Sequence, residues 1–257
     1  MKKPLILVTN DDGITAPGIK ALVEVAKSIG EVVVVAPDSP QSGMGHAITI
    51  SNPLRLHPSA IYGVEAYECS GTPVDCVKLA KNVVLKGRDI DLCVSGINHG
   101  SNASINIIYS GTLSAAMEAS LESIPSIGFS LLDFEYSADF ESSKPYIKNL
   151  MEYVLEHGLA AGSLLNVNIP KLRTADIKGM KVCRQAKARW VEEFIEAKDP
   201  RGQKYYWLTG RFVNEDIDTD TDVWALENGY ISVVPSMHDL TNYEAMKTLS
   251  AIEKTKF

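Results

Sequence analysis

The stretch Leu5-Ile6-Leu7-Val8-Thr9-Asn10-Asp11-Asp12-Gly13 determines how the rest of the chain is interpreted. Its first four residues form a short apolar run, which is typical of a strand buried on both faces of a parallel sheet. The run leads directly into turn residues and two adjacent carboxylates. Because open α/β sheets bind ligands outside the carboxyl ends of their strands, this stretch is also a candidate site.

The two aspartates have two interpretations. Asp11 or Asp12 could cap the following helix, with Asn10 and Gly13 forming the turn. Alternatively, both could bind a hard cation, because neighbouring buried carboxylates repel each other and are costly to desolvate without a positive partner. The stretch alone does not separate a helix cap from a metal site.

The residues that follow predict an α/β fold. Pro17 begins and Gly30 ends an amphipathic helix, and the valines within residues 31–36 predict a second buried strand. A β-α-β unit of this kind predicts a mostly parallel sheet. Residues 47–69 predict short strands broken by Pro53 and Pro58. Further strands are expected at residues 89–95, 124–129, 164–169 and 230–234, and further helices start near residues 72, 110, 144 and 243.

Residues 178–214 have a different pattern, in which aromatic side chains alternate with polar ones around a Pro-Arg-Gly turn. This pattern predicts a long β-hairpin that projects from the core. Its aromatic residues, which would be half exposed in a monomer, indicate a contact between subunits. The acidic run from Asp216 to Asp222 is interpreted as a solvated loop without chemistry.

Composition narrows the class of protein. The 257 residues are 45% hydrophobic and 22% charged, which is typical of a soluble globular protein. A net charge of −7 argues against a nucleic-acid polymer as partner. The four cysteines lack CxxC spacing, so we expect free buried thiols. We see neither a secretory leader nor a membrane-spanning run, so we expect a cytoplasmic protein with no membrane partner.

Polar loops follow two other predicted strands, and Ser42 and Asn98 lie in them. In a parallel sheet these loops share one edge with Asp11 and Asp12. Two carboxylates with neutral oxygen donors suit Mg²⁺ or Mn²⁺. Each of the two neutral residues could equally be an ordinary hydrogen-bonding loop residue.

The segment Ser110-Gly111-Thr112 begins a predicted helix and offers two hydroxyls and free amides, which favour a phosphate. A plain helix cap explains the same residues. Asn102 could donate to a phosphate or hold its loop, and His46 or His99 could donate a proton to a leaving alcohol or pack within its loop. A cation beside an anion site indicates phosphoryl-transfer chemistry.

Sequence motifs in order along nearly the whole chain resemble the survival protein E family of metal-dependent nucleoside-monophosphate phosphatases. The motifs are Ile6–Gly13, Val35–Asp38, Gln41–Gly43 with Gly45-His46, Gly71–Val77, Val94–Asn102, Tyr109–Thr112 with Ala115–Glu118, Leu165–Pro170, Thr219–Asp222 and Gly229–Ser232.

The resemblance implies a set of site residues. The cation, one Mg²⁺ or Mn²⁺ per subunit, would be held by Asp11, Asp12, Ser42 and Asn98. The phosphate would be surrounded by Asn102, Ser110, Gly111 and Thr112, with His46 on the substrate side. Asn10 would join Asp11 and Asp12 in the catalytic set. One departure concerns residues 235–241, where Met237 occupies the family's variable polar position and His238 comes one place later. We therefore transfer no role to His238, whereas Asp239 matches and could support the site.

The resemblance also implies the architecture and the reaction. It implies a single Rossmann-like three-layer domain over residues 1–257, with the hairpin at about 178–214 and a C-terminal segment at about 236–257 exchanged between subunits of a homodimer or homotetramer. The reaction would be hydrolysis of nucleoside 5′-monophosphates, with 3′-monophosphates and short polyphosphate as further substrates. Our own hypothesis for the mechanism is attack by a metal-activated water, and an aspartyl-phosphate intermediate is the alternative route. The alternative is a nucleotide-binding regulatory protein whose site is catalytically degenerate.

Overall fold

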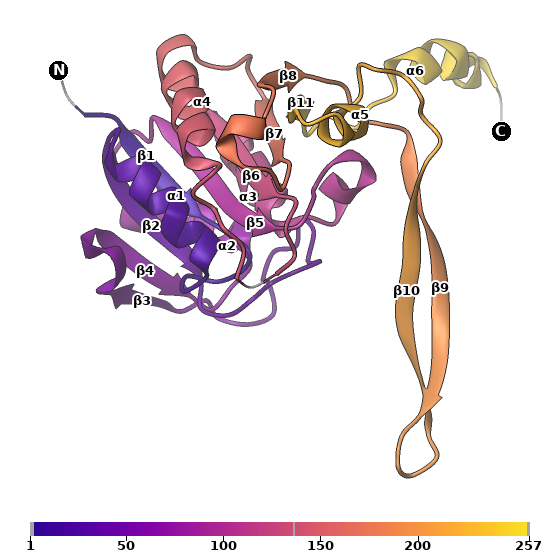
Figure 1. The fold of residues 1–257 in the computed structure, drawn as a ribbon, viewed down its shortest axis with the longest axis horizontal. Helices are drawn as coiled ribbons and strands as arrows, with labels where there is room; N and C mark the ends of the chain where they lie inside the picture. Colours follow the sequence, from indigo (N-terminus) through magenta and orange to yellow (C-terminus); the bar gives the residue numbers. More distant parts are fainter. Residues whose placement is uncertain (1–2, 136, 256–257) are drawn as a thin grey trace.

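The computed structural model describes residues 3–135 and 137–255 (Figure 1). In this part of the chain a nine-stranded sheet has the order β3-β4-β2-β1-β5-β6-β7-β11-β8. Its strands are β1 (Leu5–Thr9), β2 (Glu31–Pro37), β3 (Leu56–Ser59), β4 (Glu65–Cys69), β5 (Leu92–His99), β6 (Ser126–Leu131), β7 (Ser163–Ile169), β8 (Met180–Val182) and β11 (Ile231–Met237). The six central strands, β4, β2, β1, β5, β6 and β7, are parallel. Strand β3 runs antiparallel to β4, and β11 runs antiparallel to β7.

Helices cover both faces of this sheet (Figure 1). They are α1 (Pro17–Lys27), α2 (Pro73–Leu79), α3 (Gly111–Leu121), α4 (Lys144–His157) and α5 (Asp222–Glu227), whereas α6 (Tyr243–Leu249) extends away from the sheet. Short helical turns are η1 (Ile61–Gly63), η2 (Ala80–Val84), η3 (Ser104–Ile108), η4 (Thr174–Asp176) and η5 (Ser250–Lys254). No helix of the described residues is long and apolar enough to cross a membrane.

Strand β1 lies in the middle of the sheet and alternates its side chains between the two helical layers. Ile6 and Val8 pack in the core cluster that contains residues of α1 and α4. Leu5 and Leu7 pack in a second cluster with residues of α2 and α3. Both faces of the strand are therefore buried, which confirms the predicted three-layer α/β core. The four cysteines are free and buried, as expected.

Strand β5 is longer than the sequence pattern predicts. It continues through Gly96 to His99, so Asn98 and His99 lie at the end of a strand and not in a loop. The register with β6 shifts between Ser95 and Asn98, which marks a β-bulge, and Gly96 has a φ of +124°. The glycine that resembled a turn residue thus allows an irregular strand to continue.

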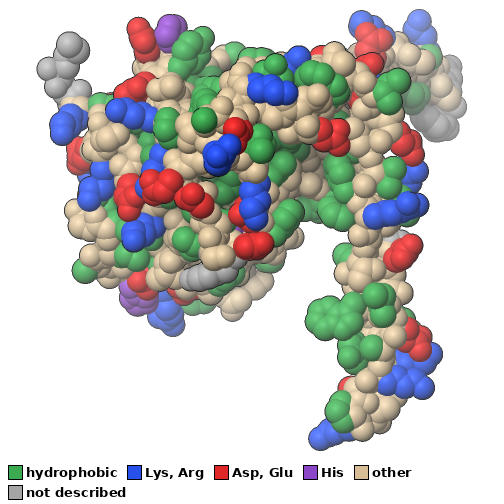
Figure 2. Space-filling model, viewed as in Figure 1, with side chains coloured by type: hydrophobic (Ala, Val, Ile, Leu, Met, Phe, Trp, Pro, Cys, Tyr) green, Lys and Arg blue, Asp and Glu red, His purple; other side chains and the backbone are tan. Residues whose placement is uncertain are grey.

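The predicted hairpin is present, but it is shorter than expected. Strands β9 (Ala188–Lys198) and β10 (Lys204–Asn214) pair antiparallel and project from the body of the molecule (Figure 1). Residues 180–182 do not belong to it, because they form β8 and pair with β11 at the sheet edge. Hydrophobic side chains are exposed along this arm (Figure 2), among them Trp207 at 64% and Leu208 at 62%.

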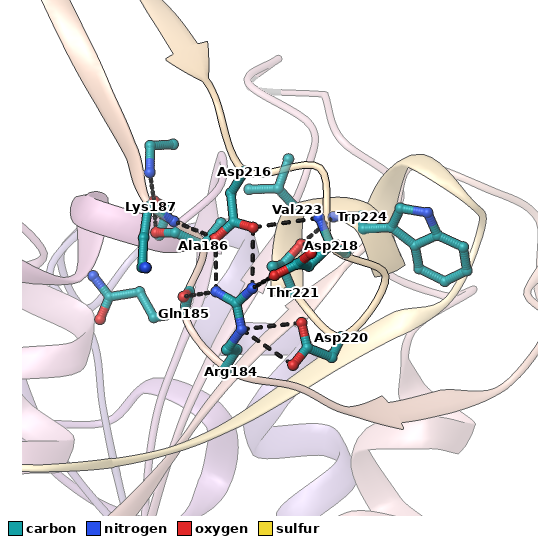
Figure 3. Close-up of polar contacts among 12 residues, drawn as sticks. Arg184, Gln185, Ala186, Lys187, Asp216, Asp218, Asp220, Thr221, Val223 and Trp224 are labelled. Carbon is teal, nitrogen blue, oxygen red and sulfur yellow. Dashed lines mark hydrogen bonds and ion pairs between the residues drawn. The ribbon is translucent and has the colours of Figure 1, made fainter.

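The acidic run from Asp216 to Asp222 forms ion pairs and hydrogen bonds at the base of the hairpin. The solvated-loop interpretation is therefore wrong for Asp216 and Asp222. Arg184 lies among three carboxylates (Figure 3): those of Asp216, Asp218 and Asp220, at 2.6, 2.7 and 3.0 Å. Asp222 is fully buried and accepts hydrogen bonds from backbone N–H groups of residues 104, 186 and 223. Backbone and guanidinium donors therefore explain why these two carboxylates are buried.

The expectations for Pro58 and for the C-terminal helix have different outcomes. Pro58 does not break a strand, because it lies inside β3, an edge strand where a missing N–H is tolerated. The expected C-terminal helix is α6, which Asn242 caps by accepting from the N–H of Ala245 at 2.9 Å. Residues 256–257 of the predicted C-terminal segment lie outside the described residues.

Gly18 allows helix α1 to approach the bulge of β5. A Cβ atom at this position would lie 2.0 Å from the carbonyl oxygen of Ile97. Alanine favours a helix over glycine by about 1 kcal/mol, but a clash with backbone costs more. We expect Gly18→Ala to lower the free energy of unfolding by about 1–3 kcal/mol in urea titrations.

Lys20→Ala serves as the control, since Lys20 is exposed on the same helix. Its effect should stay within about 0.5 kcal/mol. A Gly18→Ala protein as stable as the wild type would contradict this close packing.

Candidate metal and phosphate site

Three segments of the chain meet at Asp11, just beyond the end of β1. The Asp11 side chain accepts a hydrogen bond from the hydroxyl of Thr112 at the start of α3. Its backbone carbonyl accepts from the N–H of Gln41, in the loop after β2, at 2.7 Å. A Cβ atom on Gly111 would lie 2.7 Å from the Cβ of Asp11, so glycine is required for this approach. The loop after β2 and the start of α3 are thus tied to one aspartate.

The two aspartates are costly to ionise where they lie. Burial, followed by repulsion from Asp12, raises the pKa of Asp11 to about 6, although the Thr112 hydrogen bond opposes this. Burial also raises the pKa of Asp12, against the effect of the His99 backbone N–H. Neither carboxylate forms an ion pair with the residues that the structure describes. Among the described residues, the two carboxylates thus have hydrogen-bond donors but no cationic side chain as a partner.

Two buried oxygens beside Asp11 have no hydrogen-bond donor among the described residues. They are Oδ2 of Asp12 and Oδ1 of Asn10. The other end of the Asn10 amide is in use, because its nitrogen donates to the carbonyl of Gly13 at 2.9 Å. Leaving a buried acceptor without a partner costs about 1–3 kcal/mol. Two such oxygens next to a raised-pKa carboxylate fit a bound cation, which would supply the missing partner.

The two neutral candidate ligands border the same place. Asn98 donates its amide nitrogen to the carbonyls of His99 and Gly100, at 3.1 and 2.9 Å, so the amide oxygen is the atom suited to a cation. Ser42 is exposed and immediately follows Gln41, whose N–H is bonded to Asp11. No cluster of three or more His, Cys, Asp or Glu suited to a metal occurs in the described residues. The donor set is therefore oxygen-rich and suits Mg²⁺ or Mn²⁺.

The start of α3 holds a carboxylate, that of Asp11. Ser110 is the N-cap, and its hydroxyl accepts from the N–H of Leu113 at 3.1 Å. The backbone N–H and the hydroxyl of Thr112 both favour the ionised form of Asp11. Thr112 therefore acts on the candidate metal ligand, a contact that the sequence did not predict. Helix N-termini favour negative charge, so the same helix end stabilises the Asp11 carboxylate.

Asn102 belongs to a network of asparagines. Its N–H donates to the side-chain oxygen of Asn168 at 2.8 Å, and its side-chain nitrogen donates to Ser130 at 2.8 Å. Asn166 donates to its carbonyl at 2.9 Å. The loop-holding role left open by the sequence is therefore seen. Asn166 and Asn168 were not singled out from the sequence; the signal was a pair of polar residues alternating within the buried strand β7.

His46, in the loop after β2, contacts Glu118 of helix α3. The distance from its Nε2 to the Glu118 carboxylate is 3.0 Å. Glu118 is 3% exposed and also pairs with Lys78 of α2. Burial acts to raise the pKa of Glu118, but His46 and Lys78 outweigh it and hold the pKa below its ordinary value. The sequence signal for Glu118 was a single glutamate among the small and apolar residues of α3.

The other two histidines considered from the sequence lie in different surroundings. His99, at the end of β5, packs edge-on against the ring of Phe140, with 5.1 Å between ring centres. His238 follows β11, and it lines a surface groove that His46 also lines. Asp239 accepts from the N–H of Thr241 and the hydroxyl of Tyr243, so it supports the start of α6.

The Thr112 hydroxyl should be necessary for the stability of this site. Thr112→Val keeps the shape of the side chain but leaves a buried carboxylate oxygen without its donor, so we expect a loss of about 1–3 kcal/mol in the free energy of unfolding. Thr112→Ser retains the hydroxyl and is the matched control. Equal stabilities of the valine and serine variants in denaturant titrations would refute a role for this hydrogen bond.

Comparison with known proteins places this chain in a family. The family model "Survival protein SurE" matches residues 6–192. The chain is 62% identical to the 5′-nucleotidase SurE of Flavobacterium psychrophilum, over 97% of this chain and 98% of that protein. It is 48% identical to the 5′-nucleotidase SurE of Bacteroides thetaiotaomicron, over 94% of this chain and 93% of that protein.

A solved structure agrees with these sequence matches. The crystal structure of the SurE protein from Aquifex aeolicus matches with a TM-score of 0.85 and 43% identity, over 97% of this chain and 100% of that one. The resemblance seen in the sequence motifs is thereby confirmed, together with the α/β fold. The chain belongs to the survival protein SurE family.

Proposed function

We propose that this protein is a metal-dependent phosphomonoesterase that hydrolyses nucleoside 5′-monophosphates. The observation that carries the proposal is the group of buried oxygens at the end of β1, where Asp12 and Asn10 have acceptors without donors beside a carboxylate of raised pKa. Support for the substrate class comes from its relatives, which are named 5′-nucleotidases.

The cation would be held by oxygens of Asp11, Asp12, Ser42 and Asn98. When bound, a divalent cation polarises a phosphoryl oxygen and lowers the pKa of a water molecule. The chain itself fixes the ligands in place. Thr112 orients Asp11 through a hydrogen bond, and the bonds from Asn98 to two backbone carbonyls orient its amide. Such fixed ligands reduce the reorganisation needed during reaction.

The phosphate would lie at the start of α3, beside Asp11, which packs closely against Gly111. Backbone N–H groups at a helix N-terminus favour an anion, and Asn102 lies in the neighbouring loop. In-line displacement at phosphorus depends mainly on positioning the nucleophile and stabilising charge, and it does not require a covalent intermediate with the protein. By extension, the same site would accept 3′-monophosphates and short polyphosphate, whose reacting groups are also phosphoryl groups.

Assembly into a homodimer or homotetramer is part of the same proposal. The hairpin exposes several large apolar side chains, including Phe194, Trp207 and Leu208. Helix α6 likewise exposes Tyr243 and Met246. Soluble monomers rarely leave contiguous apolar patches of this kind uncovered, which favours a contact between copies.

The direct test is phosphate release from AMP and p-nitrophenyl phosphate with Mn²⁺ or Mg²⁺, before and after addition of EDTA. We expect activity with either cation and none with EDTA. Asp11→Asn should lower kcat at least about a hundredfold while circular dichroism shows an intact fold, because metal-assisted charge stabilisation is worth several kcal/mol.

Asp89→Asn is the matched control, since Asp89 is exposed and precedes the amino end of β5, whereas the candidate site lies at the carboxyl ends of the strands. It should leave kcat unchanged. Undiminished activity of Asp11→Asn would refute the metal-site assignment. Binding of AMP without turnover under every metal would favour the alternative, a nucleotide-binding regulatory protein.

A further inference from the structure

A groove of about 510 Å³ runs beside helix α3. Three separate segments line it: the loop after β2 provides His46, the η3–α3 region provides Ile107 and Met117, and the end of β11 with the residues after it provides Pro235 and His238. The volume lies within the range of about 300–1,000 Å³ that is usual for small-molecule pockets. Its surface is largely apolar, and polar or charged side chains, among them Arg184 and Ser114, also line it.

The groove begins about one helical turn along α3 from the candidate phosphate site. Ser114, which lines it, donates its hydroxyl to the carbonyl of the N-cap Ser110 at 2.7 Å. With a rise of about 1.5 Å per residue, Ser114 and Met117 lie about 6 and 10 Å along the helix from Ser110. A phosphate bound at the start of α3 would therefore have the groove within the reach of its ester group.

One short loop connects the metal side of the site to the groove. The N–H of Gln41 donates to the Asp11 carbonyl at 2.7 Å, and the N–H of Gly45 donates to the Tyr109 carbonyl at 3.2 Å. The next residue is His46, at the groove. The loop is thus attached at both ends, to Asp11 and to the residue that precedes Ser110.

A buried carboxylate holds His46 at the rim. The Glu118 side chain is 4% exposed, whereas that of His46 is 34% exposed, so the glutamate is covered while the imidazole remains accessible. Lys78 occupies the other carboxylate oxygen. Glu118 therefore fixes one nitrogen of His46 and limits the rotation of the ring. A fixed polar group over an apolar wall is typical of a pocket that orients its ligand.

We infer that this groove binds the nucleoside part of the substrate, with His46 as a polar contact and Glu118 as the residue that positions it. The inference rests on the proposed function. A nucleoside has flat apolar faces to lie against Ile107 and Met117, and ring nitrogens and hydroxyls that can bond to an imidazole. The rival occupant is a segment of a second copy, since Leu240 at the groove is 93% exposed.

The test compares AMP with ribose 5-phosphate, which has the same kind of leaving alcohol but no base. Met117→Phe places extra volume in the groove and should reduce the preference of kcat/KM for AMP about tenfold, mainly through the KM for AMP. Leu121→Phe is the matched control, because Leu121 lies on the same helix, is exposed and does not line the groove. It should leave the preference intact.

His46→Ala and Glu118→Ala should each reduce the same preference, whereas Glu118→Gln, which keeps a hydrogen-bond acceptor for His46, should restore part of it. Adenosine binding by calorimetry in each protein gives a readout independent of catalysis. Adenosine that binds the wild type but not Met117→Phe supports the groove even if no phosphatase activity is found. Equal losses for AMP and ribose 5-phosphate, or adenosine affinity unchanged by Met117→Phe, would overturn it. If Met117→Phe changes the oligomeric state but leaves the AMP preference intact, the nucleoside assignment is overturned in favour of a contact between copies.

Discussion

The cost of burying two adjacent carboxylates at the end of a central strand shapes this molecule. Asp11 is 4% exposed, and burial together with the charge of Asp12 raises its pKa to about 6. A carboxylate in this position needs a cation or hydrogen-bond donors brought to it from elsewhere in the chain. The Thr112 hydroxyl and the end of α3 are such donors, and the close approach of Gly111 makes their contact with Asp11 geometrically feasible.

The topology explains why these donors come from distant parts of the sequence. Strand β1 pairs in parallel with β2 on one side and β5 on the other. The carboxyl ends of all three strands therefore lie together, and the loop after β2 and the bulged end of β5 flank the aspartates. Gly18 lets α1 pack against that bulge, so the first helix also supports the end of β5 that carries Asn98.

Local patterns predicted much of this fold and much of the candidate site. The apolar run before Asp11 indicated the central strand, and Ser110 followed by Gly111 indicated the start of a helix at the site. The contact between Thr112 and Asp11 joins residues that are 101 positions apart, and no local pattern encodes such a contact. The role of Glu118 was hidden for the same reason, because a single glutamate in an apolar helix does not reveal its partners.

The errors in the sequence interpretation arose where pairing overrode local pattern. Gly96 resembled a turn residue, but hydrogen bonding to β6 carries β5 past it as a bulge. Residues 180–182 resembled the start of the hairpin, but they pair with β11, which is far along the chain. The acidic run resembled a solvated loop because Arg184, its counter-charge, lies more than thirty residues earlier.

The central claim is that Asp11 and Asp12 share one divalent cation. The most direct measurement is a titration of the metal-free protein with Mn²⁺, followed by electron paramagnetic resonance or calorimetry, for the wild type and for Asp12→Asn. The account predicts one Mn²⁺ per chain in the wild type and an affinity at least about tenfold to a hundredfold weaker in the variant. Equal Mn²⁺ affinity in the two proteins would contradict it.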